Sequence, residues 1–221
     1  MEKVLEETQW IAVMAGTPVD SRMGVEMLAQ HGLSARPYAM AADPIAQTAF
    51  QNQPAAEKTA AVRQVLEEIA ASGCTQVLVY CNSLSGAVDF ELLAQEVQLQ
   101  IVTPLMVYRT LATRYHCLAV IAANAQGLAG IERTLYAENP QLAVLGTTLL
   151  PVVGAIERSQ LPQEIVTRYD LLRLTDWFAR CGAEALVLGC THFPYLTDAL
   201  VAHTALPLID PAQEMVRLLA Q

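Results

Sequence analysis

Two apolar stretches of the chain end in the same way and lie 109 positions apart. "VLVYC" ends on Cys81 and "LVLGC" ends on Cys190, and each cysteine comes eight residues after a glycine. The stretch at 10–16, "WIAVMAG", similarly resembles "CLAVIAAN" at 117–124, at an offset of 107 positions. Because the chain has 221 residues, both offsets are about half of its length. The pattern favours an internal duplication over a chance likeness of two strand–helix units.

Strand-like apolar runs alternate with helical patterns throughout the chain, which is typical of an α/β protein with mostly parallel sheets. We expect a first strand over 10–16 and strands that end at Cys81 and Cys190. The amphipathic segments 55–73 and 165–182 occupy equivalent places and predict one helix each, with a glycine at the end of each.

The predicted fold is therefore α/β, with two pseudo-symmetric, flavodoxin-like domains and mostly parallel sheets. The first domain (the Cys81 side) is expected to comprise residues 1–100 plus 206–221, and the second (the Cys190 side) residues 101–205. Parallel sheets bind ligands at the carboxyl ends of their strands. Two related domains facing each other across a pseudo-twofold axis would bring both cysteines to one cleft between them.

Composition limits the class of protein. With 53% hydrophobic and 16% charged residues, the chain is expected to be globular, and no apolar run is long enough to span a membrane. The start, "MEKVLEETQW", lacks the apolar core of a secretory signal, so a cytoplasmic location is expected. A net charge of −9 argues against nucleic acid and acidic membrane surfaces as partners, but leaves a small-molecule substrate open.

The chain has five cysteines, none in a zinc-binding spacing, so free thiols and no metal are expected. Cys74, Cys117 and Cys181 lie in no motif, and we expect them to be small buried apolar residues. Cys81 and Cys190 differ because polar residues follow each of them.

Asn82 and Ser83 follow Cys81, and Thr191 and His192 follow Cys190. A thiol in a loop that leads into a helix is favoured as thiolate, and a neighbouring histidine can exchange a proton with it near neutral pH. One such cysteine would suit a nucleophile. A matched pair on opposite walls favours two-base chemistry, in which one thiolate removes a proton from carbon and the opposite thiol returns one. No phosphate-binding loop, metal triad or pyridoxal-type lysine is recognisable, so no cofactor is expected.

"LVLGCTHFPYL" (186–196) resembles the second cysteine signature of the glutamate racemases, and "LVYCNSLSG" (78–86) is similar to their first. Weaker matches are "RPYA" (36–39), "LAVIAAN" (118–124) and "PLIDPAQEMVRLL" (207–219). Together they cover nearly the whole chain. The chain thus resembles the aspartate/glutamate racemase superfamily, and the glutamate racemases most.

The resemblance implies roles for individual residues. Cys81 and Cys190 would be the acid/base pair, with His192 assisting Cys190. The residues expected to contact the substrate come from both cysteine motifs and from the "RPYA" loop: Asn82, Ser83, Thr191, Pro37 and Tyr38.

Two positions depart from the family pattern. Glutamate racemases have Asp-Ser-Gly after the first strand, where direct alignment gives Ala15-Gly16-Thr17, which is more like the aspartate-racemase branch. A five-residue slip instead matches Asp20 and Ser21, so Thr17, Asp20 and Ser21 are all candidates for substrate contact. A glutamate of the family is replaced by Gly154, and Glu157 follows three residues later.

The function expected from the resemblance is cofactor-independent racemisation of an acidic amino acid, with L-glutamate to D-glutamate as the leading reaction. Its implied role is to supply D-glutamate for bacterial peptidoglycan. The alternatives are racemisation of aspartate, another amino acid or a hydantoin, a lyase or cis–trans isomerase of the superfamily, and a non-catalytic small-ligand-binding relative. The resemblance also suggests a homodimer.

Overall fold

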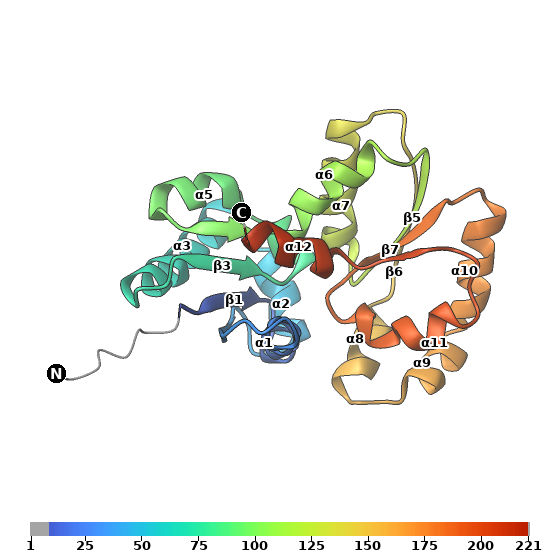
Figure 1. Ribbon diagram of the computed structural model, residues 1–221, viewed down its shortest axis with the longest axis horizontal. Helices are drawn as coiled ribbons and strands as arrows, with labels where there is room; N and C mark the ends of the chain where they lie inside the picture. The colour runs from blue at the N-terminus through green and yellow to red at the C-terminus, as the bar shows by residue number, and fades with distance from the viewer. Residues whose placement is uncertain (1–8, 221) are drawn as a thin grey trace.

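The structure is a computed structural model that describes residues 9–220; Met1–Thr8 and Gln221, which the predicted first domain includes, lie outside the described residues. Two four-stranded parallel sheets form the frame, one in each half of the chain. Figure 1 shows the strands of the first sheet on one side and those of the second sheet on the other, with the red helix α12 (Pro211–Leu219) between them.

The first sheet has the strand order β2-β1-β3-β4, with all neighbours parallel. Its strands are β1 (Ile11–Ala15), β2 (Ala35–Ala39), β3 (Gln76–Val79) and β4 (Gln100–Val102). Its helices are α1 (Pro18–Gln30), α2 (Pro44–Gln51), α3 (Ala55–Ala71), α4 (Asn82–Ser85) and α5 (Phe90–Val97). Crossover helices join parallel strands, as the alternating sequence pattern predicts.

The second sheet repeats this order as β6-β5-β7-β8. Its strands are β5 (Cys117–Ala122), β6 (Ala143–Thr148), β7 (Ala185–Gly189) and β8 (Leu208–Ile209). The helices of this half are α6 (Pro104–Ala112), α7 (Ala125–Glu138), α8 (Leu150–Glu157), α9 (Pro162–Arg168), α10 (Leu171–Arg180), the 3-10 turn η1 (Phe193–Leu196), α11 (Thr197–Val201) and α12 (Pro211–Leu219). The repeated order confirms the predicted α/β fold with two similar sheets.

The chain returns from the second half to the first only after β8. Leu208 and Ile209 pair with β7 in the second sheet, whereas the sequence predicted that residues from 206 onward complete the first domain. The helix α12 then packs against α6, β3 and β4, and Figure 1 shows it lying back toward the first sheet. The division into 1–100 plus 206–221 and 101–205 remains a proposal.

The two halves share one apolar core. In β5, Leu118, Val120 and Ala122 join the cluster that contains the strands of the first sheet. Ala119 and Ile121 of the same strand belong to a second cluster, beneath α8 to α10. This alternation follows from the two-residue period of a strand. The second sheet is therefore covered on both faces, which explains why its central strands are continuously apolar.

Three local predictions are wrong. The expected helix over 165–182 is two helices, α9 and α10, because Asp170 adopts a left-handed conformation (φ 53°) that interrupts the helix. "RPYA" is not a loop but most of β2, paired with β1. Cys181 is exposed and Cys117 half-buried, since both lie at the ends of elements rather than within them; only Cys74 is buried as expected.

Candidate active site

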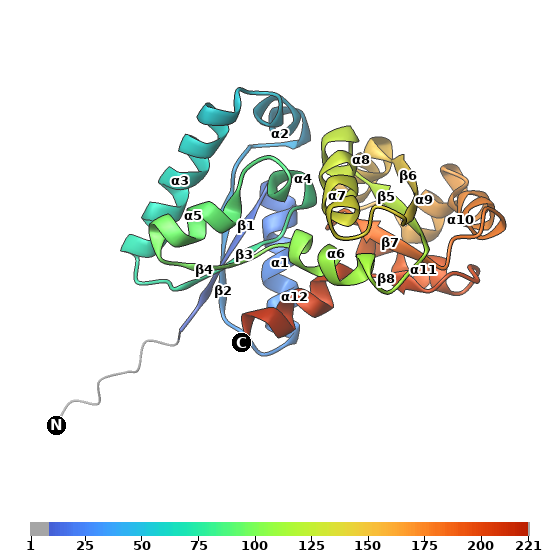
Figure 2. The ribbon, with the colours of Figure 1, turned by 90° about the horizontal axis from the view of Figure 1, so that it is seen from above.

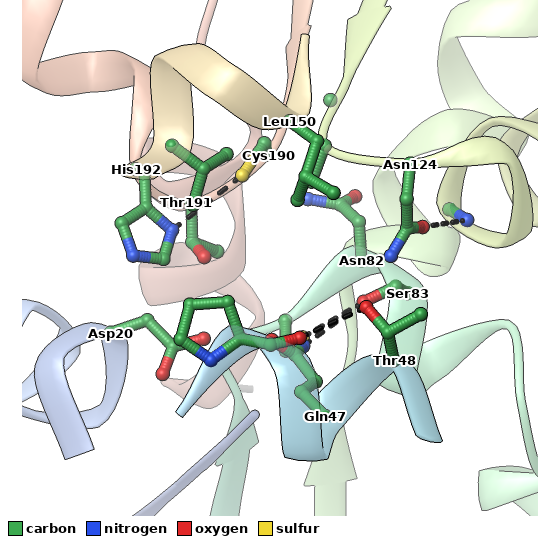
Figure 3. Close-up of a pocket in the computed structure, with 16 residues that line it drawn as sticks. Asp20, Gln47, Thr48, Asn82, Ser83, Asn124, Leu150, Cys190, Thr191 and His192 are labelled. Atoms are coloured by element: carbon green, nitrogen blue, oxygen red, sulfur yellow. Dashed lines mark hydrogen bonds between the residues drawn. The ribbon is translucent and has the colours of Figure 1, made fainter. Parts of the chain in front are cut away.

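The two motif cysteines occupy equivalent positions in the two halves. Cys81 follows β3 and begins α4, whereas Cys190 directly follows β7, and β3 and β7 hold the same place in their sheets. Both are nearly fully buried, and both line one pocket between the halves. The same pocket is lined by Asn82, Ser83, Thr191, His192 and Asp20 (Figure 3). The structure thus brings together seven of the residues that the sequence singled out.

On the Cys190 side, His192 connects the thiol to a carboxylate. Its Nδ1 lies 3.6 Å from Cys190 Sγ, and its Nε2 lies 3.2 Å from Glu157 Oε1. Burial disfavours a charged imidazole, but the hydrogen bonds to Cys190 and Glu157 outweigh it and raise the pKa of His192 to about 10. At neutral pH the imidazolium can therefore donate one N–H to the sulfur and the other to the carboxylate.

Glu157 lies near Gly154, the position where the sequence has glycine instead of the family's glutamate. It ends α8, one helical turn after Gly154, so that both positions lie on the same side of the helix. The carboxylate is mostly buried, with 14% of the side chain exposed, and its Oε1 also lies 3.3 Å from the Thr17 hydroxyl. The hydrogen bond between Thr17 and Glu157 therefore joins the end of α8 in the second half to the N-cap of α1 in the first half.

On the Cys81 side, Asp20 is the buried charged group. The start of α1 fixes it: the N–H groups of Gly16 and Thr17 donate to its two carboxylate oxygens at 3.2 Å and 2.6 Å, and the Thr17 hydroxyl lies 2.9 Å from Oδ1. Burial raises the pKa of Asp20, while the charge of His192 and these hydrogen bonds oppose the shift. Asp20, which the five-residue slip matches to the family's aspartate, therefore lies in the pocket. The N–H groups that hold its carboxylate belong to Gly16 and Thr17, which the direct alignment places at that position.

Cys81 is a protonated thiol at neutral pH. Burial, and after it the negative charge of Asp20, raise the pKa of the Cys81 thiol to about 12, although a hydrogen bond with Ser83 acts in the opposite direction. The two sides of the pocket thus differ, because Cys190 faces an imidazolium and Cys81 faces a carboxylate.

The polar residues after each cysteine are held in place from outside the pocket. The buried hydroxyl of Tyr108 in α6 donates to Asn82 Oδ1, and Gln51 Nε2 donates to Ser83 Oγ at 2.6 Å. The Tyr80 hydroxyl donates to the Thr191 carbonyl at 3.5 Å, from the first half to the second. These contacts hold the side chains of Asn82 and Ser83 and the backbone of Thr191, three residues that we expect to meet a substrate.

The pocket also contains residues that the sequence did not single out. Gln47 and Thr48 of α2 line it, together with Asn124, Leu150 and Val153. Figure 2 shows α2 and α4 beside α7, where the two halves meet. Asn124 had one recognisable signal, since it follows β5 and caps α7 just as Thr17 follows β1 and caps α1. Asp43-Pro44 is a helix-start pattern, but nothing in it indicates that α2 faces the cleft.

Four expected substrate contacts do not line this pocket. Pro37 and Tyr38 lie in β2, and the Tyr38 ring stacks on Trp10 with 6.3 Å between centroids. Ser21 faces back into α1, where its hydroxyl donates to the Pro18 carbonyl. Thr17 contributes through Asp20 and Glu157 rather than as part of the pocket wall.

Residues 9–220 contain neither a membrane-spanning helix nor a cluster of side chains suited to a metal ion. No helix in this range is long and apolar enough to cross a membrane. No group of three or more His, Cys, Asp or Glu side chains in it is arranged to hold a metal ion.

Fold and site together define a class of protein: an α/β chain with two like sheets, each of which brings one thiol to a shared buried pocket. The chain is 30% identical over 148 residues to the glutamate racemase of Limosilactobacillus reuteri (strain DSM 20016), which covers 64% of this chain and 54% of that relative. It thus spans about half the length of this curated relative. No family model matches the chain.

Solved structures show the same fold. The glutamate racemase of Francisella tularensis subsp. tularensis SCHU S4, solved in complex with D-glutamate, superposes with a TM-score of 0.71 at 16% identity, over 96% of this chain and 80% of that one. An aspartate racemase homologue from Pyrococcus horikoshii OT3 gives 0.69 at 13% identity, over 96% and 100%. By sequence and fold, the chain is similar to the aspartate/glutamate racemase superfamily and most like the glutamate racemases, which confirms the resemblance predicted from the two cysteine motifs.

Proposed function

We propose that this protein is a cofactor-independent amino-acid racemase that inverts Cα by proton transfer between Cys81 and Cys190. The observation that carries the proposal is that one thiol from each half lines a single buried pocket. Similarity to curated glutamate racemases supports the reaction class.

The reaction needs one thiolate and one thiol, on opposite faces of the substrate. The thiolate removes the Cα proton with the C–H electron pair left on carbon, and the opposite thiol then donates its proton to the other face. The protons balance, because each turnover moves one proton from Cys81 to the substrate and one from the substrate to Cys190, or the reverse.

The charges around the two thiols suit one direction of proton transfer. With its pKa raised to about 12, chiefly by burial, the Cys81 thiol keeps its proton at neutral pH. His192, protonated because its pKa is about 10, can donate to the Cys190 sulfur while that sulfur carries negative charge. In this direction Cys190 is the base and Cys81 the acid.

The remaining polar groups are suited to an amino acid. The carboxylate of Asp20 can accept from a substrate ammonium, and Asn82, Ser83 and Thr191 can donate to a carboxylate. Since a Cα proton is weakly acidic, the pocket must also stabilise the developing negative charge and exclude water, and the burial of both thiols meets the second need.

Glutamate is the leading substrate because the curated relatives are glutamate racemases. On this proposal the product D-glutamate would serve bacterial peptidoglycan. Aspartate is the second candidate, favoured by the Gly16-Thr17 sequence at the end of β1 and by the similar fold of an aspartate racemase homologue.

Incubation of the purified protein with L-glutamate or L-aspartate in heavy water tests the proposal. A racemase gives deuterium at Cα together with loss of optical rotation, whereas a non-catalytic binding protein gives neither. Cys81→Ala and Cys190→Ala should each abolish the reaction from both enantiomers, and the serine variants should leave at most a trace, because an alcohol is a far weaker acid than a thiol. Full activity in either alanine variant would refute the two-thiol mechanism.

A further inference from the structure

Gln47 of α2 extends into the reaction pocket. Its Nε2 lies 3.2 Å from Cys81 Sγ and 3.2 Å from Ser83 Oγ, so that its carboxamide directly contacts one of the two thiols. Figure 3 shows Gln47 and Thr48 on the opposite side of the pocket from Cys190, Thr191 and His192. A group in this position lies where a substrate held between the two thiols would extend.

The end of β1 leaves space for this side chain. A Cβ added at Gly16 would lie 2.0 Å from Gln47 Nε2, and the three atoms nearest to it all belong to Gln47. Gly16 has no left-handed backbone conformation that would itself call for glycine. The missing side chain at residue 16 and the long one at residue 47 are therefore complementary in shape.

With Gln47 in place, the pocket is nearly full. The free cavity measures about 20 Å³, little more than one water molecule requires. An amino acid therefore fits only if the pocket widens, and a lining side chain that turns away is one way to widen it.

The hydrogen bonds of Gln47 differ from those of Asn82, Ser83 and His192. Asn82 is held by Tyr108, Ser83 by Gln51, and His192 by Glu157. Gln51 itself accepts from Asn124 at 3.0 Å, which connects α2 to α7. By contrast, both hydrogen bonds that the structure shows for the Gln47 side chain are made by Nε2 and end inside the pocket. A substrate can replace both.

We propose that Gln47 is a substrate-contacting residue that limits the length of amino acid the pocket accepts, so that it hinders the five-carbon glutamate more than the four-carbon aspartate. The inference rests on the proposed racemase function. The side chain of Gln47 occupies volume that the additional methylene of glutamate needs, so that glutamate must displace it further than aspartate does. One methylene in a closed pocket typically changes specificity by about tenfold or more.

The test compares Gln47→Ala with Gln47→Met in the full chain. Alanine removes the length of the side chain, whereas methionine keeps the length and removes only the amide. Gln53→Ala, an exposed position just beyond α2, is the matched control for a glutamine-to-alanine change outside the pocket. For each protein, kcat/KM is measured with L-aspartate and L-glutamate from deuterium incorporation at Cα.

We expect Gln47→Ala to shift the glutamate-to-aspartate ratio of kcat/KM toward glutamate by about tenfold, with Gln47→Met and Gln53→Ala within about twofold of the wild type. A ratio unchanged in Gln47→Ala, or shifted equally in Gln47→Met, overturns the proposal. If no protein exchanges the Cα proton, the racemase function fails instead. In that case, calorimetric titration of the same four proteins gives the ratio of the dissociation constants for L-glutamate and L-aspartate. A ratio that shifts toward glutamate in Gln47→Ala alone supports the size limit, and a ratio that is unchanged there, or shifted equally in Gln47→Met, overturns it.

Discussion

At the scale of single residues, Asp20 and His192 set the charges that the two thiols face. If Asp20 assists proton transfer, Asp20→Asn should reduce turnover by about a hundredfold, the usual effect of losing one acid/base group. The fold should survive, because the asparagine oxygen can still accept from the Thr17 N–H, which makes the shorter of the two backbone bonds to Asp20. Initial rates with L-glutamate and L-aspartate, together with circular dichroism, measure both effects.

Thr17→Val is the companion variant, since Thr17 contacts Asp20 and Glu157 without lining the pocket. We expect it to lose less activity than Asp20→Asn. A large loss of activity in Thr17→Val alone would instead indicate that Thr17, and not Asp20, does the work of the family's Asp-Ser-Gly.

His192 should also make stability depend on pH. Its pKa in the folded protein, about 10, lies above the ordinary 6.5, so folding favours the charged form. This contribution is complete below pH 6.5 and is lost as pH rises toward 10, by up to about 1.4 kcal/mol per pH unit for one group. Urea unfolding between pH 6.5 and 9 should therefore show a smaller decline in His192→Asn than in the wild type. The exposed His203 provides the control, and equal slopes for His192→Asn and His203→Asn would contradict the prediction.

At the scale of elements, α2 matters because it carries Gln47 and Thr48 into the pocket. Its N-cap is Asp43, whose carboxylate accepts from Ile45 N and Ala46 N at 2.9 and 2.8 Å. Asp43→Ala should cost about 1 kcal/mol of helix stability. Because a frayed α2 must be ordered again when substrate binds, KM should rise by up to about fivefold, the factor that corresponds to 1 kcal/mol.

Asp89 caps α5 in the same way, with bonds from Glu91 N and Leu92 N at 3.1 and 3.0 Å, but it is absent from the pocket. Asp89→Ala should lower stability by a similar amount and leave KM unchanged. If steady-state kinetics give the same KM for both alanine variants, α2 does not govern access to the pocket.

At the scale of the whole molecule, the shared core predicts that the two halves unfold together. The sequence has two tryptophans, with Trp10 beside the first sheet and Trp177 in α10 of the second half. Trp10→Phe and Trp177→Phe each leave one reporter. Because β5 and β7 contribute to the same apolar cluster as β1 and β3, urea titrations followed by fluorescence should give coincident midpoints. If the two variants gave different midpoints, and the wild type showed transitions at both, the halves would unfold independently.

The sequence by itself determined the features that depend on neighbours in the chain. The strands before Cys81 and Cys190 could be predicted because a buried parallel strand is a short, continuous apolar run. The two cysteine motifs each lie within about ten residues, so their likeness to a known family needed no structure. The repeated pattern predicted two similar parallel sheets, whereas the order of their strands came from the structure.

Only the tertiary structure decided which surfaces meet. Gln47 contacts Cys81 across 34 residues, Glu157 reaches His192 across 35, and Thr17 meets Glu157 across 140. Tyr38 was predicted at the substrate but lies on Trp10, and β8 was predicted in the first domain but pairs with β7. Such contacts depend on how helices and sheets pack, which local propensity and periodicity do not specify. The chain alone therefore indicates the two thiols, and the packing of α2 and α8 supplies the groups that surround them.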